Sequence, residues 1–232
     1  MGIMMYLLFM IPPLIFMIWA QSRVSSAYKK YARVPNMNGV TGAQAARTLL
    51  AYNGLNDVKI EGTRGQLTDH YDPRHKVLRL SSGVAGNPSV AALGIVAHEV
   101  GHAVQDNLGY APMRVRSALV PVANLGSRFG FVCVILGVIL FAFNVAFGET
   151  LAWVGVWLFV AAVLFALVTL PVEYDASNRA RLMLKSTGLV SAREYEGASA
   201  VLSAAALTYV AALLQVIAQL FFFLLLVLGM RR

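Results

Sequence analysis

Cysteine and charge are both scarce in this 232-residue chain. A single cysteine, Cys133, excludes a disulfide framework within the chain and a metal cluster held by several thiolates. Only 13% of the residues are charged, against about 25% in soluble domains, and 58% are hydrophobic. The composition therefore predicts an integral membrane protein.

Charged side chains are absent from four long apolar runs. A helix needs roughly 20 apolar residues to cross a hydrocarbon core of about 30 Å, so we interpret the runs as transmembrane helices. They cover residues 3–20, 129–147, 151–171 and 207–230. If the last run crosses the membrane, Arg231-Arg232 lie on the far side, against the positive-inside rule. The alternative is that this run is partly re-entrant or packs along the protein. No Lys or Arg precedes the first run, which favours an uncleaved anchor over a signal peptide.

Acidic residues are fewer than basic ones, 11 against 19, and the net charge is +8. Residues 21–128 and 172–206 hold 17 of the 19 basic side chains, many beside the ends of the apolar runs. The positive-inside rule then places both segments in the cytoplasm. Topology and anionic lipid explain the charge, so we expect the lipid bilayer as a partner and no nucleic acid.

Between the apolar runs the sequence predicts helices and a small β element. Thr41 caps a helix that ends at Asn53-Gly54, and Pro88 opens a helix that is apolar nearly all round and must be buried. We predict the following elements: helices over 44–52, 89–107 and 172–185, and strands over 58–62 and 77–81, the second after a turn at 72–74.

The predicted helix 89–107 contains the stretch GIVAHEVGHAVQD. His98 and His102 are four residues apart, so both imidazoles lie on one face and can hold one zinc ion. Glu99 borders the open coordination position and can act as general base on the attacking water. The spacing is the H-E-x-x-H pattern of metalloproteases. A cation also offsets the cost of burying Glu99 in ionised form. Gly94 and Gly101 are expected to leave room for the metal and a substrate backbone.

Zinc in a catalytic site takes a third protein ligand, and the best candidate is Glu173 in the stretch PVEYDASNRARLML. Ala176, one turn further on, would let this helix approach the histidine helix closely. Asp175 points to another face and is expected to support a ligand or to pair with Arg179. His70 and His75 are more distant alternatives as ligands. His70 or Tyr71 is a candidate hydrogen-bond donor to an oxyanion.

Three stretches, LTDHYDPRHKVLRLS, AALGIVAHEVGHAVQD and LPVEYDASNRA, make the chain resemble the YugP-like neutral zinc metallopeptidases, a family of bacterial membrane proteins related to HtpX-type membrane proteases. The resemblance implies a mainly α membrane protein with a zincin-like catalytic domain, an H-E-x-x-H helix plus a Glu helix, on about four transmembrane helices. It also implies the bacterial inner membrane as location. Ser177 stands where the wider group has an Asp that orients a zinc ligand; Ser177, Asn178 or Asp175 can substitute.

These observations predict an endopeptidase with one Zn²⁺ per chain that cleaves membrane or membrane-presented proteins at the cytoplasmic face. The predicted strand 77–81 is expected to pair with the substrate backbone, as an edge strand would. The alternative is a membrane scaffold or chaperone with a structural zinc, which needs a fourth ligand. A transporter is disfavoured because the apolar runs carry no ionisable ion-path residues. Gly126, Gly130 and Gly137 suggest a homo-oligomer through helix association.

Overall fold

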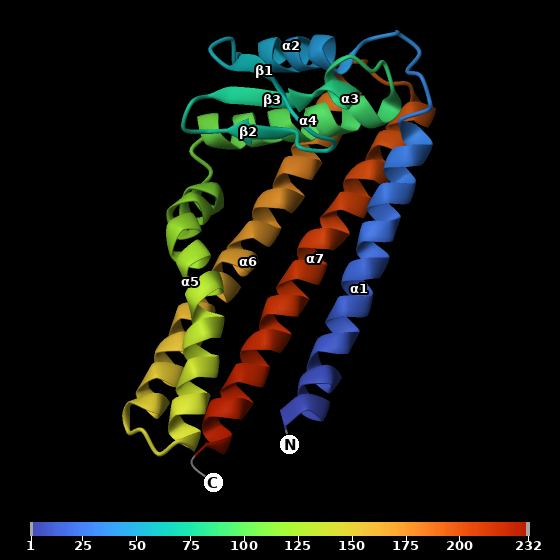
Figure 1. Ribbon diagram of the computed structural model, residues 1–232. Coiled ribbons are helices and arrows are strands. Elements are labelled where there is room, and N and C mark those ends of the chain that lie inside the picture. Colours follow the sequence, from blue (N-terminus) through green and yellow to red (C-terminus); the bar gives the residue numbers. More distant parts are fainter. Residues whose placement is uncertain (1, 231–232) are drawn as a thin grey trace. The chain divides into compact units, whose positions relative to one another are not determined.

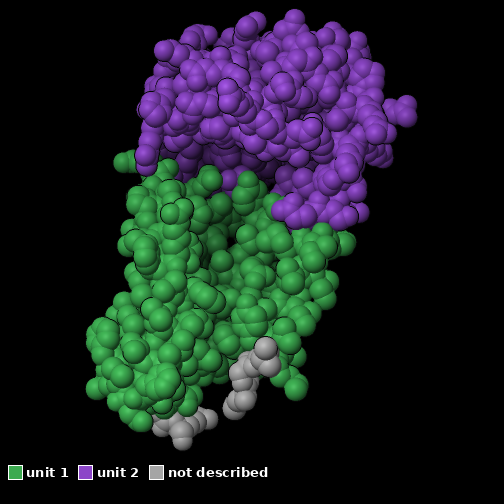
Figure 2. Space-filling view, viewed as in Figure 1, with its two compact units in different colours: residues 1–19, 114–171, 208–232 green, residues 20–113, 172–207 purple. Residues whose placement is uncertain are grey.

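The computed structural model describes residues 2–230, and Arg231 and Arg232 lie outside the described residues. The chain forms two compact units (Figure 2). Unit 1 is made of residues 1–19, 114–171 and 208–232. Unit 2 is made of residues 20–113 and 172–207. Most residues are helical, and the three strands belong to unit 2 (Figure 1).

Four helices supply most of the described residues of unit 1, and each is long and apolar enough to cross a membrane. They are α1 (Gly2–Tyr31), α5 (Ala111–Ala142), α6 (Phe147–Ser186) and α7 (Ala192–Gly229). Their apolar parts confirm the prediction of a mainly α membrane protein with about four membrane-spanning helices. Each helix is longer than the apolar run that predicted it. α1, α6 and α7 include polar residues of unit 2, and α5 begins at Ala111, well before its apolar run.

The third apolar run and the helix expected after Pro171 form one element. α6 continues through Pro171 without a break. A proline inside a helix removes its own N–H donor and crowds the carbonyl four residues earlier. Helices in membranes tolerate this where neighbouring groups satisfy the freed carbonyl. The sequence therefore placed a boundary at Pro171 that the structure does not have.

Three glycines of α5 pack against α6 within unit 1. A Cβ on Gly126 would clash with the carbonyl of Leu158, and one on Gly137 would lie 2.4 Å from the backbone nitrogen of Ala152. Gly130 is similarly close to the Gly155 carbonyl, at 3.0 Å. The glycines thus allow two helices of the same chain to touch. The expectation that they serve association between copies is wrong for this face, because it is already covered.

Unit 2 contains the short elements between α1 and α5. They are α2 (Gly42–Tyr52), β1 (Lys59–Thr63), β2 (His70–Asp72), β3 (Val77–Ser81), α3 (Ser82–Ala85) and α4 (Val90–Asn107). Thr41 and Gln44 form a capping box at the start of α2, which confirms the predicted cap. The side chain of Ser89 caps α4 by accepting from Ala92 N.

The sheet has the order β1-β3-β2, with β1 parallel and β2 antiparallel to β3. Lys59 aligns with Val77 across the first pair, and Tyr71 aligns with Leu78 across the second. Because β3 has a neighbour on both sides, it has no edge left for a substrate strand. The expected pairing of a substrate with 77–81 is therefore wrong, and the edge strands are β1 and β2.

The helix α4 forms the centre of the core of unit 2. Of its 18 residues, 13 are buried, as its all-round apolar character predicts. Gly101 packs against α6, where an added Cβ would lie 2.6 Å from the carbonyl oxygen of Ala176. Gly94 packs against α7, where an added Cβ would lie 3.3 Å from the carbonyl oxygen of Ala198. These glycines therefore admit neighbouring helices rather than a substrate, while the predicted close approach at Ala176 is present.

Candidate metal centre

Three potential metal ligands from α4 and α6 converge inside unit 2. The ligand atoms of His98, His102 and Glu173 all lie within 4.8 Å of one another. Glu173 Oε2 is 3.1 Å from His98 Nε2 and 3.4 Å from His102 Nε2. The Glu173 side chain is only 2% exposed and that of His102 only 9% exposed, so water contributes little to the solvation of this cluster.

The two contacts made by Glu173 have the spacing of ligands around a zinc ion. Ligand atoms about 2.0–2.2 Å from a tetrahedral zinc lie roughly 3.3–3.6 Å from one another, close to the two contacts made by Glu173. Two imidazole nitrogens and one carboxylate oxygen are also a donor set that zinc prefers. Both imidazoles turn Nε2 towards Glu173, and this shared direction is what a common ion requires.

A buried glutamine fixes the orientation of His102. Gln105 Nε2 donates to the carbonyl of Val172 at 2.8 Å and to Asp175 Oδ2 at 2.8 Å. Both partners are acceptors, so the amide nitrogen must face them and Gln105 Oε1 must face His102. His102 Nδ1 donates to this oxygen at 2.9 Å. The proton is thus held on Nδ1, and Nε2 keeps its lone pair for a metal.

The second histidine has a weaker supporting contact. His98 Nδ1 lies 3.2 Å from Ser177 Oγ, so Ser177 occupies the place of the expected orienting Asp with a shorter, neutral side chain. Asp175 does not touch an imidazole in these contacts; it accepts from Gln105 and, at 2.6 Å, from Arg179 Nε. The predicted pair between Asp175 and Arg179 is present.

Glu99 lies next to this cluster on α4 and is 9% exposed. Burial raises the pKa of Glu99 above its ordinary value, while the neighbouring imidazoles of His98 and His102 oppose this change. A cation at the cluster would favour the carboxylate further. Tyr71 N donates to Glu99 Oε2 at 3.0 Å, which anchors one oxygen of the carboxylate. The Glu99 carboxylate is thus buried and anchored beside the cluster.

The strand β2 brings Tyr71 to Glu99 and is itself held on two sides. The Tyr71 hydroxyl donates to Asp106 Oδ2 of α4 at 2.9 Å. Burial, together with this hydrogen bond, raises the pKa of Tyr71, so the phenol remains a neutral donor. In this structure the Tyr71 hydroxyl donates its proton to Asp106, which does not favour the expected contact of Tyr71 with an oxyanion.

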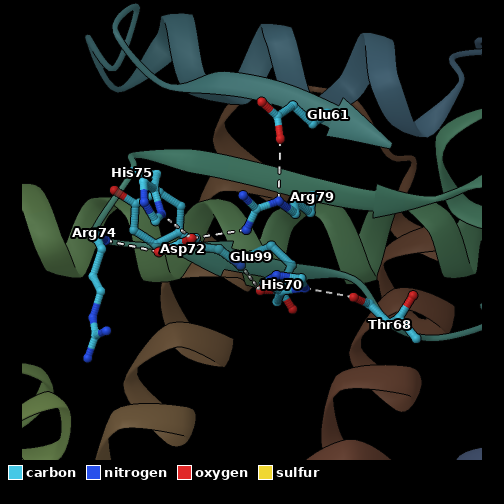
Figure 3. A network of polar contacts seen from close by, with 9 residues as sticks. Glu61, Thr68, His70, Asp72, Arg74, His75, Arg79 and Glu99 are labelled. Atoms are coloured by element: carbon cyan, nitrogen blue, oxygen red, sulfur yellow. Dashed lines mark hydrogen bonds and ion pairs between the residues drawn. The ribbon is translucent and has the colours of Figure 1, made fainter. Parts of the chain in front are cut away.

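An ionic network ties β2 to the rest of the sheet (Figure 3). Arg79 of β3 pairs with Asp72 of β2 at 3.0 Å and with Glu61 of β1 at 3.4 Å. His75 Nδ1 is 2.7 Å from Asp72, and this hydrogen bond holds the pKa of Asp72 well below its usual range. The network fixes the strand that carries the contact to Glu99.

Three of the candidate residues lie outside the cluster of ligands. His70 is exposed and its Nδ1 bonds the carbonyl of Thr68 at 2.8 Å (Figure 3). His75 is exposed and bonded to Asp72. Asn178 is exposed and accepts from Arg181 Nη1 at 3.0 Å, away from both imidazoles. Neither distant histidine belongs to the group of three potential ligands found in residues 2–230.

Sequence reasoning missed Gln105 and the backbone N–H of Tyr71. Gln105 is three residues after His102 on a mostly buried helix, so a search for polar residues on the histidine face would have found it. The N–H of Tyr71 carries no signal in the sequence, because every residue except proline has one. Only the approach of β2 to α4 identifies it.

We predict that Gln105→Leu lowers zinc affinity by about 10–100-fold, the usual effect of losing a group that orients a metal ligand. The leucine keeps the volume but leaves His102 Nδ1–H and the Val172 carbonyl without their partner. Competition with a chromogenic chelator measures the affinity. Ser177→Ala, which removes the longer contact to His98, is expected to have the smaller effect. Wild-type affinity in Gln105→Leu would show that the amide does not orient His102.

A buried His-His-Glu cluster with an adjacent buried carboxylate, in a chain with four membrane-length helices, defines a membrane protein with a metallohydrolase-type site. The comparisons with known proteins agree. Residues 6–228 match the family described as "Putative neutral zinc metallopeptidase". A similar protein, "Putative membrane protease YugP" of Bacillus subtilis (strain 168), is 42% identical over 228 residues, covering 98% of this chain and 99% of the relative. No solved structure matches the chain.

The chain therefore belongs to this family of neutral zinc metallopeptidases. The match spans both units, so it includes the apolar helices as well as the metal centre. Zn²⁺ is the cofactor of such a family, and the cluster of His98, His102 and Glu173 has the donor set and the spacing to hold it.

Proposed function

We propose that the chain is a zinc endopeptidase of the H-E-x-x-H plus Glu type, with His98, His102 and Glu173 as ligands and Glu99 as catalytic base. The observation that carries this proposal is the position of Glu99, buried and anchored beside a cluster that offers three ligands. Three protein ligands leave a coordination position open, as in catalytic zinc sites. A zincin-like catalytic domain is the corresponding fold for unit 2.

In this proposal, bound Zn²⁺ supplies a Lewis acid that polarises the scissile carbonyl and activates a water molecule at neutral pH. Tyr71 N–H holds Glu99 Oε2, which leaves Oε1 to accept the proton of the attacking water. Glu99 then passes this proton to the leaving amine. Gln105 keeps His102 Nε2 available throughout by holding the proton on Nδ1.

The edge strand β2 is the proposed guide for the substrate backbone. It pairs with β3 along one edge. Its other edge carries the Tyr71 N–H that contacts Glu99. An extended peptide aligned along this edge would lie beside the catalytic base. Because the Tyr71 N–H is already bonded to Glu99, the peptide would pair with the outward main-chain carbonyl of Tyr71. Strand β2 thus replaces β3 in the role expected from the sequence.

We propose membrane proteins or peptides presented at the membrane as substrates, cleaved at the cytoplasmic face of the bacterial inner membrane. Glu173 follows the apolar run 151–171 by two residues, so this ligand is close to the membrane boundary along the chain. The excess of Lys and Arg in 21–128 and 172–206 supports the cytoplasmic side. The relative from Bacillus subtilis supports a bacterial membrane.

Removal of zinc tests the enzyme against its alternative, a scaffold or chaperone with a structural zinc. We expect a chelator to abolish cleavage of an unfolded reporter protein, to leave the circular dichroism spectrum unchanged, and to be reversed by added Zn²⁺. A structural zinc takes four protein ligands and supplies folding free energy, so its removal would unfold the domain. Unfolding on zinc removal, or full cleavage without zinc, would reject the proposal.

A further inference from the structure

A cavity of about 440 Å³ lies in unit 2 between the end of α1 and the beginning of α7. Its walls include Arg23, Lys30 and Tyr31 of α1 and Ser203 of α7. The two helices run side by side here (Figure 1), and a Cβ on Gly197 of α7 would lie 2.7 Å from the Tyr31 ring. Small-molecule sites have volumes of about 300–1,000 Å³, so the cavity is large enough for a ligand.

The charged residues that line this cavity are all basic. Arg23 and Lys30 are seven residues apart and therefore lie on one face of α1. On the opposite wall, Ser203 Oγ accepts from Arg181 Nη2 of α6 at 2.9 Å, although Arg181 itself does not line the cavity. Cations that converge on one cavity create a positive potential that attracts anions. The hydroxyl of Ser203 adds a polar group that can hydrogen-bond to an anionic oxygen.

The residues of the cavity lie at the boundary of the apolar runs. Arg23 follows the run 3–20 by three residues, about 4.5 Å along the helix. Leu207, which also lines the cavity, is the first residue of the run 207–230. The headgroup layer is about 5–7 Å thick on each side of the hydrocarbon core, so a membrane crossed by the run 3–20 would place the Arg23 end of the cavity at headgroup depth. Basic pockets beside membrane helices bind anionic lipid headgroups.

We propose that this cavity is a binding site for the phosphate-bearing headgroup of an anionic membrane lipid. Arg23 and Lys30 contact the phosphate from α1, and the Ser203 hydroxyl, which accepts from Arg181, donates to a headgroup oxygen from the other wall. The site contains none of the proposed zinc ligands, so it is separate from the peptidase reaction. An acidic peptide is the rival occupant, but it would not need a cavity at headgroup depth.

The test measures lipid retained by the purified full-length chain. The protein is incubated in detergent with equimolar phosphatidylglycerol and phosphatidylcholine, and bound lipid is counted by native mass spectrometry. We expect wild type to retain one phosphatidylglycerol in preference to phosphatidylcholine. Arg23→Gln and Lys30→Gln, which keep most of each side-chain stem, should each lower retention about fivefold, the effect of one basic residue at a membrane surface. Arg23→Lys should restore most of it.

Lys29→Gln is the matched control, because it removes the same charge from the same helix next to Lys30 but outside the cavity lining. It should retain lipid like wild type. An equal loss in all three Gln variants would mean general surface charge and would overturn the proposal. Equal retention of both lipids, displacement by millimolar inorganic phosphate, or displacement by an acidic peptide would also overturn it. Zinc content and thermal melting should stay at wild-type values in every variant.

Discussion

Replacing Glu99 by Gln should lower the rate of peptide cleavage by at least about 10²–10⁴-fold while zinc stays bound. The amide has nearly the same shape and can still accept from Tyr71 N–H through its oxygen. It cannot take a proton from water, so the base is lost and the ligands remain. Cleavage of an unfolded reporter protein in detergent, together with zinc content by mass spectrometry, measures both quantities on one sample.

Asp57→Asn is the control for this substitution. Asp57 lies in the same unit, is exposed, and makes a 2.6 Å ion pair with the exposed Lys76, outside the network that holds β2. Its replacement should leave cleavage within about twofold, because an exposed pair contributes little to stability. Cleavage by Glu99→Gln at the wild-type rate would remove Glu99 from the mechanism. Loss of zinc in the same variant would instead point to a structural role.

The second large effect is expected from the proposed ligands. His98→Ala, His102→Ala and Glu173→Gln should each lower zinc content about tenfold or more after dialysis, and cleavage should fall in parallel. The chain supplies its own controls, because it has four histidines and only two belong to the cluster. His70→Ala and His75→Ala should keep zinc, since their Nδ1 atoms bond Thr68 and Asp72 instead.

Two further variants separate ligand loss from unfolding. Glu173→Asp keeps the carboxylate but shortens the side chain by one methylene, so zinc should bind more weakly than in wild type and more tightly than in Glu173→Gln. A normal circular dichroism spectrum in all ligand variants is required for this comparison. Zinc retained by both His98→Ala and His102→Ala, or lost from His75→Ala, would contradict the assignment of the cluster.

The membrane class and the H-E-x-x-H helix were predictable because both depend only on local sequence. Apolar runs identify the spans by length alone, and the spacing of His98 and His102 follows from helical geometry without any tertiary contact. Thr41 likewise predicts the start of α2, because its own side chain forms the N-cap. The break expected at Pro171 failed because a single missing N–H does not end a helix whose neighbours stabilise it.

Errors in the expected uses of glycine and of β3 have a common origin. A glycine in the sequence signals that another group approaches the backbone closely, but the sequence does not identify that group. Gly101 admits Ala176, and Gly126 admits Leu158, in places where a substrate or a second copy was expected. The alternation in 77–81 signals a strand, yet the order β1-β3-β2 decides that it is central. Neighbours in space are set by chain topology, which local patterns do not encode.

The sequence by itself determined the membrane class, the paired histidines on one helix face and the carboxylate between them, because these depend on composition and on the period of a helix. Only the tertiary structure decided that Glu173 meets both imidazoles, that Gln105 orients His102, and that a strand N–H anchors Glu99. Those contacts join residues up to 75 positions apart. Their geometry depends on how α4, α6 and β2 pack, since packing fixes distances that sequence separation leaves open.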